Sequence, residues 1–219
     1  MLITGTSGFI GYKFLKYILT KDYLIIDILR EKNKKNSKLK ELKKKHPKNY
    51  RSIFFSDYRH LERKIKKLKI NYFVNFATLY KNSHVYNDIF DFIKSNILFP
   101  TLLYDLISKK ANKVINFGSM MQHDAGEKFQ SKNFYSATKN AFEMINNFYK
   151  HKEKSTKFYN LKLYESFGEN DNRKKLIPTI IRNYKKRKTT VILSKNLELN
   201  IIHVDDIIKA LNILLNNNI

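Results

Sequence analysis

The chain contains no cysteine and no tryptophan, and it has three prolines and six glycines in 219 residues. Without cysteine there is neither a disulfide bond nor a thiolate metal site, which suits a cytoplasmic enzyme. No run of eighteen apolar residues occurs and no charged-then-apolar leader opens the chain. We therefore expect neither a membrane span nor secretion. The six histidines form no closely spaced ligand pair, so no metal site is predicted.

Acidic residues are also scarce, since 19 Asp and Glu face 43 Lys and Arg and leave a formal net charge of +24. Such a charge attracts polyanions and phosphorylated ligands. The densest basic block, Arg30–Lys45, contains glutamates but no aromatic residue on which a base would stack. We interpret it as a solvated loop and helix, and binding to nucleic acid is the least favoured of the functions considered.

Short apolar stretches alternate with amphipathic ones of helical period along the chain. This alternation predicts an α/β fold of the Rossmann-like, doubly wound type, with a parallel sheet, helices on both faces and ligands at the carboxyl edge. The length and the 42% hydrophobic content predict a single domain over 1–219. A long helix is expected over 86–109, with a kink at Pro100. Strands are predicted at 2–3, 23–29, 51–56, 72–77 and 113–118.

Three of the six glycines separate the first predicted strand from the first helix, in the pattern G-x-x-G-x-x-G. Without a Cβ, this turn lets a dinucleotide pyrophosphate approach the backbone at the helix N-terminus. An ordinary loop is the alternative, but the position between strand and helix is the one that the motif requires. The predicted turn residues are Gly5, Ser7, Gly8, Phe9, Ile10 and Gly11.

The end of the second predicted strand is where such a fold selects its cofactor. A carboxylate there binds the adenosine ribose, whereas an arginine pairs with a 2′-phosphate. Both Asp27 and Arg30 stand near this end. If the strand continues through Leu29, Arg30 lies at its tip, which slightly favours NADP(H) over NAD(H). Asp57 and Tyr58, after the third strand, are expected to contact the adenine.

Residues 119–139 carry the chemistry. Tyr135 and Lys139 are four residues apart in a predicted helix, so both side chains project from one face. A nearby ammonium stabilises a phenolate and lowers the pKa of the phenol from its usual value near 10. Tyr135 would then exchange a proton with a carbonyl oxygen, and Ser119, at the tip of the fifth strand, would hold that oxygen.

Together these features resemble the extended short-chain dehydrogenase/reductase family of nucleotide-sugar epimerases, dehydratases and reductases. The family resemblance implies a catalytic triad of Ser119, Tyr135 and Lys139. It also implies that Phe76, Ala77 and Lys139 contact the cofactor. It further implies that the protein is a homodimer. The segments that carry it are Gly5–Gly11, Asp57, Asn75–Ala77 (with Asn75 where histidine is usual), Ser95–Asn96, Ser119–Lys139, Lys162–Gly168 and His203–Asp206.

The family resemblance also narrows the reaction. Its 4,6-dehydratases carry an Asp-Glu pair after the catalytic hydroxyl residue, where this chain has Met120 and Met121. Thioethers do not transfer protons, which disfavours dehydration and leaves a 4-epimerase or a 4-keto reductase. The stretch Asn170–Pro178 resembles the CDP-abequose and CDP-paratose synthases, which reduce a CDP-4-keto-3,6-dideoxyhexose with NADPH. A CDP-sugar is therefore the favoured substrate.

Two departures from the family pattern affect the substrate lobe. The family's pyrophosphate-binding arginine aligns with Leu199, and the chain ends soon after the helix that follows His203–Asp206. We expect 168–200 to form a reduced lobe. A trimmed enzyme, a truncated product and a catalytically inactive protein that retains the cofactor fold all stay open. The predicted substrate-binding residues are Met120, Tyr164, Glu165, Arg173, Lys174 and Lys175.

Overall fold

The computed structural model describes residues 1–127, 130–192 and 196–217. The chain divides into two compact units, Met1–Lys162 and Leu163–Ile219. The predicted single domain over 1–219 stays a prediction.

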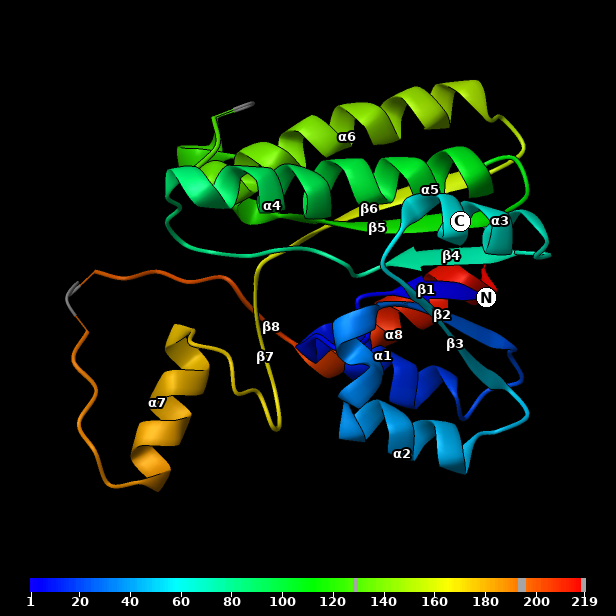
Figure 1. Ribbon diagram of the computed structural model, residues 1–219. Helices are drawn as coiled ribbons and strands as arrows, with labels where there is room; N and C mark the ends of the chain where they lie inside the picture. The colour runs from blue at the N-terminus through cyan, green and yellow to red at the C-terminus, as the bar shows by residue number, and fades with distance from the viewer. Residues whose placement is uncertain (128–129, 193–195, 218–219) are drawn as a thin grey trace. The chain divides into compact units, whose positions relative to one another are not determined.

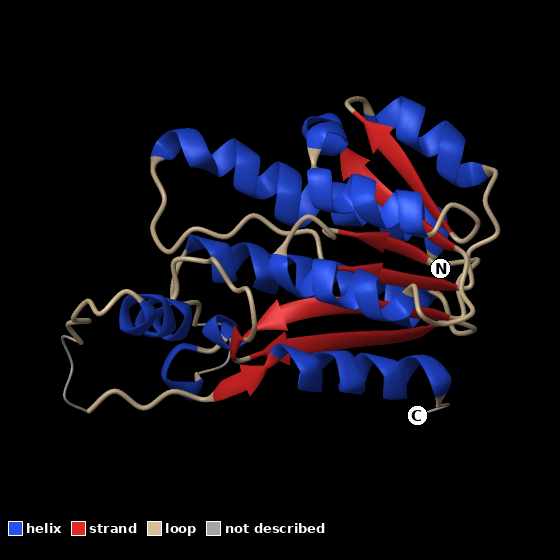
Figure 2. Cartoon of the chain, turned by 90° about the horizontal axis from the view of Figure 1, so that it is seen from below, coloured by secondary structure: helices blue, strands red, loops and turns tan. Residues whose placement is uncertain are grey.

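A six-stranded sheet forms the centre of the first unit, in the order β3-β2-β1-β4-β5-β6 (Figure 2). Every strand pair from β3 across to β5 is parallel. From β1, the strands β2 and β3 follow towards one edge of the sheet, and β4, β5 and β6 follow towards the other edge. This is the arrangement of a doubly wound fold, so the fold class predicted from the sequence is confirmed. The strands are β1 (Leu2–Thr4), β2 (Ile25–Arg30), β3 (Tyr50–Phe55), β4 (Tyr72–Asn75), β5 (Lys113–Ser119) and β6 (Lys157–Leu163).

Helices cover both faces of this sheet (Figure 1). One face carries α1 (Phe9–Ile18) and α2 (Ser37–Lys45). The other carries α3 (Tyr58–Lys66), α4 (Ile89–Ile93), α5 (Phe99–Ile107) and α6 (Phe134–Lys152). The basic block Arg30–Lys45, which the sequence indicated as a solvated loop and helix, contains α2. This helix buries only its two leucines.

The core on the α3–α5–α6 face is built by alternate strand residues, because successive side chains of a strand point to opposite faces. Leu2, Phe73 and Val114 come from three adjacent strands and are fully buried in it. Tyr104 of α5 packs edge-on against Phe142 of α6, with ring centroids 5.1 Å apart. This packing fixes α6, which carries two of the predicted catalytic residues, against the sheet.

The helix expected over 86–109 is helical but not uniform. A 3₁₀ turn at Tyr86–Asp88 leads into α4, and a π-helical turn at Lys94–Leu98 joins α4 to α5. The irregularity in this helix is therefore the wider π turn, and the kink predicted at Pro100 stays a prediction. Proline lacks the N–H that an α-helical bond requires, and Pro100 lies in the first turn of α5, where that N–H has no helical partner.

The second unit contains a two-stranded parallel sheet, β7 (Glu165–Phe167) and β8 (Ile201–His203), with helices α7 (Leu176–Lys185) and α8 (Val204–Asn216). The segment Lys162–Gly168, which carries part of the family resemblance, is divided between β6 and β7. The strand beside β5 ends at Leu163, and the residues after it pair with β8. The expected lobe, 168–200, belongs to this unit and contributes α7.

Within the described ranges, no helix is both long enough and apolar enough to cross a membrane.

Candidate functional site

The turn between β1 and α1 is closed by the Gly8 amide, which donates to the Gly5 carbonyl at 3.0 Å. Gly5 has a φ of +74°, and a Cβ there would lie 2.4 Å from the Ala77 nitrogen; a Cβ on Gly11 would lie 2.4 Å from the Gly5 oxygen. Gly8 is exposed, and the nearest atom to its Cβ would be 3.3 Å away. The turn is therefore closed on the sheet side and open at Gly8, where α1 begins. This fits a dinucleotide pyrophosphate.

The remaining turn residues flank that opening. Ser7 is exposed, while Phe9 and Ile10 are half-buried in the first turn of α1. On the neighbouring strand, the Ala77 amide donates to Thr4 Oγ1 at 3.3 Å. Phe76 stacks on Phe117 with ring centroids 4.7 Å apart. These contacts place Phe76 and Ala77 against the glycine turn, as the cofactor prediction requires.

Asp27 lies inside β2 and Arg30 ends it, which is the register that the sequence favoured. The Asp27 side chain is completely buried. Its Oδ2 accepts hydrogen bonds from the Thr6 hydroxyl at 2.5 Å and from the Tyr50 hydroxyl at 2.8 Å. Its Oδ1 has no hydrogen-bond partner among the described residues. Burial raises the Asp27 pKa to about 7.

Around the tip of β2, basic and hydroxyl groups gather at the predicted adenine end. Arg30 Nη2 donates to Ser95 Oγ at 3.0 Å, and its charge acts on the Tyr58 phenol. Lys94 Nζ lies 6.0 Å from the centre of the Tyr58 ring. Asp57 caps α3, because its Oδ2 accepts from the His60 amide at 2.9 Å. The pKa of Asp57 is lowered below its usual value by hydrogen bonds from backbone amides, the largest effect being that of His60.

The three predicted catalytic residues meet in the first unit. Ser119 ends β5, Tyr135 and Lys139 lie in the first turns of α6, and all three are buried. The side chains of Ser119 and Thr78 act on the Tyr135 phenol and lower its pKa. Lys139 Nζ lies 5.9 Å from the centre of the Tyr135 ring and donates to the Phe117 carbonyl at 2.8 Å.

Burial is the strongest influence on both titrating groups. It raises the Tyr135 pKa to about 12, with the side chains of Thr78 and Ser119 opposing it. The same effect lowers the Lys139 pKa to about 8. Desolvation of the phenolate is therefore the largest influence on the phenol, and the lowering of its pKa by Lys139 and a positively charged nicotinamide stays a prediction.

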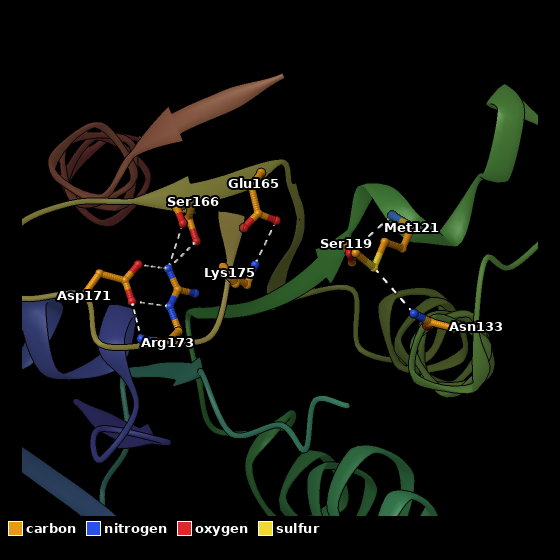
Figure 3. A network of polar contacts seen from close by, with 8 residues as sticks. All are labelled: Ser119, Met121, Asn133, Glu165, Ser166, Asp171, Arg173 and Lys175. Carbon is orange, nitrogen blue, oxygen red and sulfur yellow. Dashed lines mark hydrogen bonds and ion pairs between the residues drawn. The ribbon is translucent and has the colours of Figure 1, made fainter. Parts of the chain in front are cut away.

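A short 3₁₀ turn, Met120–Gln122, supports Ser119. The Met121 amide donates to Ser119 Oγ at 3.3 Å, and Asn133 contacts the Met121 sulfur (Figure 3). The Ser119 amide donates to Gln122 Oε1 at 2.8 Å. Gln122 is fully buried, and its Nε2 donates to the side chains of Asn140 and Glu143. The sequence analysis did not find Gln122, whose only signal is its place three residues after Ser119.

A row of polar side chains across four adjacent strands was also missed. Thr4 Oγ1 donates to Asn75 Oδ1 at 2.7 Å, Asn75 Nδ2 to Asn116 Oδ1 at 3.0 Å, and Asn116 Nδ2 to Asn160 Oδ1 at 2.9 Å. The row runs from the carboxyl ends of β1 and β4 to the middle of β5 and β6. It fixes the relative register of the strands from which the site residues emerge.

In the second unit, Arg173 is anchored within its own loop (Figure 3). Its Nε and Nη2 donate to the two carboxylate oxygens of Asp171 at 2.8 and 2.6 Å, and Nη2 also reaches the Ser166 carbonyl at 2.7 Å. Lys175 pairs with Glu165 at 3.0 Å. Arg173 and Lys175 therefore each lie beside a carboxylate.

The other predicted substrate residues lie open to solvent. Tyr164 and Lys174 in the second unit are exposed, as is Met120 in the first. Leu199 is 40% exposed. The substrate roles of Met120, Tyr164, Glu165, Arg173, Lys174 and Lys175 stay predictions. Among the residues that the structure describes, no group of three or more His, Cys, Asp or Glu side chains is placed to hold a metal ion.

A doubly wound sheet, a glycine turn open at a helix N-terminus and a Ser, Tyr and Lys cluster beside the carboxyl edge define a Rossmann-type dinucleotide-binding protein. The model of the NAD dependent epimerase/dehydratase family matches residues 1–219. The chain belongs to this family.

Relatives of known function agree with that assignment. The chain is 25% identical over 213 residues to the CDP-abequose synthase of Yersinia pseudotuberculosis, covering 96% of this chain and 71% of the relative. It is 24% identical over 223 residues to the CDP-abequose synthase of Salmonella typhimurium strain LT2, covering 99% and 70%.

Solved structures show the same fold at lower identity. The UDP-glucuronic acid 4-epimerase of Bacillus cereus, solved with UDP-glucuronic acid and NAD, superposes with a TM-score of 0.82 at 16% identity, over 100% of this chain and 73% of that one. The dTDP-glucose 4,6-dehydratase of Bacillus anthracis strain Ames, solved with NAD, gives 0.79 at 22% identity, over 100% and 72%.

The glycine turn generates the first prediction. Gly11→Ala and Gly5→Ala should each destabilise the protein by about 2 kcal/mol or more, because the new Cβ meets backbone atoms. Gly8→Ala should cost less, about 1 kcal/mol, because its Cβ would meet only the Gly5 oxygen, at 3.3 Å. Chemical unfolding without added nucleotide would measure this. Equal losses for all three variants would contradict the geometry.

Asp27 generates the second prediction. Its folded pKa of about 7 lies above the unfolded value near 3.9, so the wild type should lose stability as pH rises from about 4 to about 7. Asp27→Asn removes this loss and should gain at most about 4 kcal/mol relative to wild type across that window. Denaturant unfolding at several pH values would test it, with Asp22→Asn, at an exposed position, as the control. Parallel stability curves for wild type and Asp27→Asn would show that the prediction is wrong.

Proposed function

We propose that the chain is an NAD(P)-dependent nucleotide-sugar oxidoreductase of the 4-keto reductase or 4-epimerase type. The observation that carries this is the buried Tyr135 phenol beside Ser119, which ends β5, and Lys139, which lies one helical turn further along α6. Tyr104, a structural tyrosine of the core, has an amide partner for its hydroxyl, Asn146. The Tyr135 phenol is instead influenced by the hydroxyl side chains of Ser119 and Thr78, and an ammonium lies 5.9 Å from its ring centre, as proton exchange requires.

The residues have separable roles in this proposal. Ser119 donates a hydrogen bond to the sugar oxygen that changes between carbonyl and alcohol. Tyr135 gives its proton to that oxygen during reduction and takes it back in the reverse direction. Lys139 contributes positive charge near the phenol. The glycine turn and Phe76–Ala77 would hold the nicotinamide cofactor, which would supply the hydride.

Within this class we favour reduction of a CDP-4-keto sugar. Met120 and Met121 follow Ser119 where a dehydratase needs an acid and a base, and both relatives named above are CDP-abequose synthases. Neither thioether exchanges protons. Reduction and epimerisation need only the hydride and the proton that Tyr135 handles.

NADP(H) is the favoured cofactor. Arg30 at the tip of β2 and Lys94 beside Tyr58 place two cations where an adenosine 2′-phosphate would lie in this fold. Asp27 is the competing determinant, but its Oδ2 accepts both of its hydrogen bonds from within the protein, and the whole side chain is buried. A carboxylate buried in this way is a poorer acceptor for a ribose hydroxyl.

A homodimer through α4–α6 is part of the same proposal. Phe90 of α4 and Met144 and Phe148 of α6 are 71%, 59% and 57% exposed. Large apolar side chains that are exposed together on neighbouring helices favour a protein partner. A second copy presents the same surface, and a twofold interface is self-complementary.

Tyr135→Phe tests the chemistry. It should lower turnover of a CDP-4-keto-3,6-dideoxyhexose by at least about 100-fold, because the proton donor is lost. The dissociation constant of NADPH should stay within about twofold of wild type. Tyr149→Phe is the matched control, a second buried tyrosine of α6 whose hydroxyl contacts Asp105 instead. Cofactor binding without turnover by the wild type would support the inactive alternative, and full activity of Tyr135→Phe would remove this residue from the mechanism.

Arg30→Ala tests the cofactor preference. Loss of a charge-assisted contact to a 2′-phosphate should weaken NADPH binding by about 10- to 100-fold and change NADH binding by less than about threefold. Fluorescence titration of both cofactors would measure this. Arg51→Ala, at an exposed position in the neighbouring strand β3, is the control. Wild-type protein that binds NADH more tightly than NADPH would overturn the preference.

A further inference from the structure

Resting on the proposed function, we infer that Gln122 is a positioning residue for the reaction. Its amide fixes the backbone of Ser119 against α6, and so sets where the Ser119 hydroxyl meets the sugar oxygen. Gln122 is the last residue of the 3₁₀ turn Met120–Gln122, which directly follows β5. The residue is fully buried, so it acts through Ser119 rather than by contact with the substrate.

Ser119 and Gln122 are joined across this turn in the reciprocal manner of a capping box. The Ser119 amide donates to Gln122 Oε1 at 2.8 Å, and the Met121 amide donates to Ser119 Oγ at 3.3 Å. A serine hydroxyl has one proton and two acceptor lone pairs. Because the Met121 amide uses one of the lone pairs, the Ser119 proton stays available for the sugar oxygen.

The other end of the Gln122 amide is bound to α6. Its Nε2 donates to Asn140 Oδ1 at 2.8 Å and to Glu143 Oε2 at 2.6 Å, so both of its protons are used. Asn140 Nδ2 in turn donates to the Gln122 carbonyl at 3.0 Å. Asn140 directly follows Lys139 in the helix. Gln122 therefore joins the backbone of Ser119 to the helix that carries the other two proposed catalytic residues.

The space for the Gln122 side chain depends on Gly118. A Cβ on Gly118 would lie 2.5 Å from Gln122 Oε1 and 3.0 Å from Lys162 Cγ. Lys162, at the end of β6, pairs with Glu143 at 3.0 Å. The carboxylate that accepts from Gln122 is therefore itself held by a cation from the neighbouring strand. Contacts from β5, β6 and α6 together give the Gln122 amide one orientation.

These contacts matter for the proposed reaction because the site is assembled from separate segments. Ser119 comes from β5, whereas Tyr135 and Lys139 come from α6. A single 3₁₀ turn has poorer hydrogen-bond geometry than an α-helix and provides little rigidity of its own. A displacement of about 1 Å in a reacting group can lower a rate by about 100-fold. Loss of the Gln122 amide should therefore affect the chemical step more than substrate binding.

Two variants separate the Ser119 contact from the presence of a polar side chain. Gln122→Met removes the amide and keeps the length. The double variant Gln122→Glu/Glu143→Gln exchanges the amide and the carboxylate, so it keeps the net charge and an acceptor for the Ser119 amide. With CDP-4-keto-3,6-dideoxyhexose and NADPH, Gln122→Met should lower kcat by about 10- to 100-fold while KM changes by less than about threefold. The double variant should keep kcat within about threefold of wild type.

Asn146→Leu is the matched control for a general loss of stability. It removes another buried amide of α6, one that accepts from the Tyr104 hydroxyl at 2.9 Å. It should destabilise the protein and leave kcat within about twofold of wild type. A wild-type kcat in Gln122→Met would overturn the inference. So would equal losses of kcat in Gln122→Met and in either of the other two variants.

A second measurement does not depend on turnover. Hydrogen exchange of the Ser119 amide, followed by NMR, should become at least about 10-fold faster in Gln122→Met relative to the Ile115 amide of the same strand. The double variant should retain the wild-type ratio. If the wild type binds NADPH but turns over no keto sugar, the proposed function fails, while this exchange still decides whether Gln122 holds Ser119. An unchanged ratio in Gln122→Met would refute the contact.

Discussion

Desolvation of the phenol and the amine on α6 is the constraint on which the rest of the site depends. Tyr135 and Lys139 are both buried, and burial disfavours the charged form of each. An enzyme that needs a phenolate during its cycle must offset this effect locally. The side chains of Ser119 and Thr78 lower the pKa of the phenol and so offset part of the desolvation. The Lys139 ammonium lies 5.9 Å from the centre of the Tyr135 ring. Helical spacing alone therefore does not make the tyrosine acidic.

The surrounding structure holds these hydroxyl groups in place. The row Thr4–Asn75–Asn116–Asn160 fixes the register of the strands, so that the loops after β4 and β5 emerge at defined positions. Gln122 orients the backbone of Ser119. The π-helical turn carries Asn96, whose amide joins the loop after β4 to α6. Wider helical turns of this type occur often at functional sites. In this protein the turn provides polar atoms that a regular helix would use for its own bonds.

The spacing of apolar residues and the positions of glycines were sufficient to predict the order of helices and strands. Buried parallel strands and amphipathic helices differ in their apolar pattern. The glycine turn, Ser119, Tyr135 and Lys139 were predicted from spacing, and the register of β2 followed from its apolar length. Thr78, Asn96 and Gln122 were not assigned roles, because they act through contacts between segments distant in sequence. The effect of burial on the Tyr135 pKa was not predicted, since a one-dimensional pattern shows the neighbouring charge but not the depth of burial.

The free-energy cost of burying the Lys139 ammonium bears on whether the chain is an active enzyme or an inactive protein that retains the fold. Lowering its pKa from 10.5 to about 8 corresponds to about 3 kcal/mol of unfavourable free energy at neutral pH. The hydrogen bond to the Phe117 carbonyl offsets part of this, and a methionine of similar length would avoid the penalty. A structural role therefore explains the lysine poorly. A desolvated amine beside a buried phenol and two hydroxyl groups is typical of a site where proton transfer takes place. This favours the active enzyme.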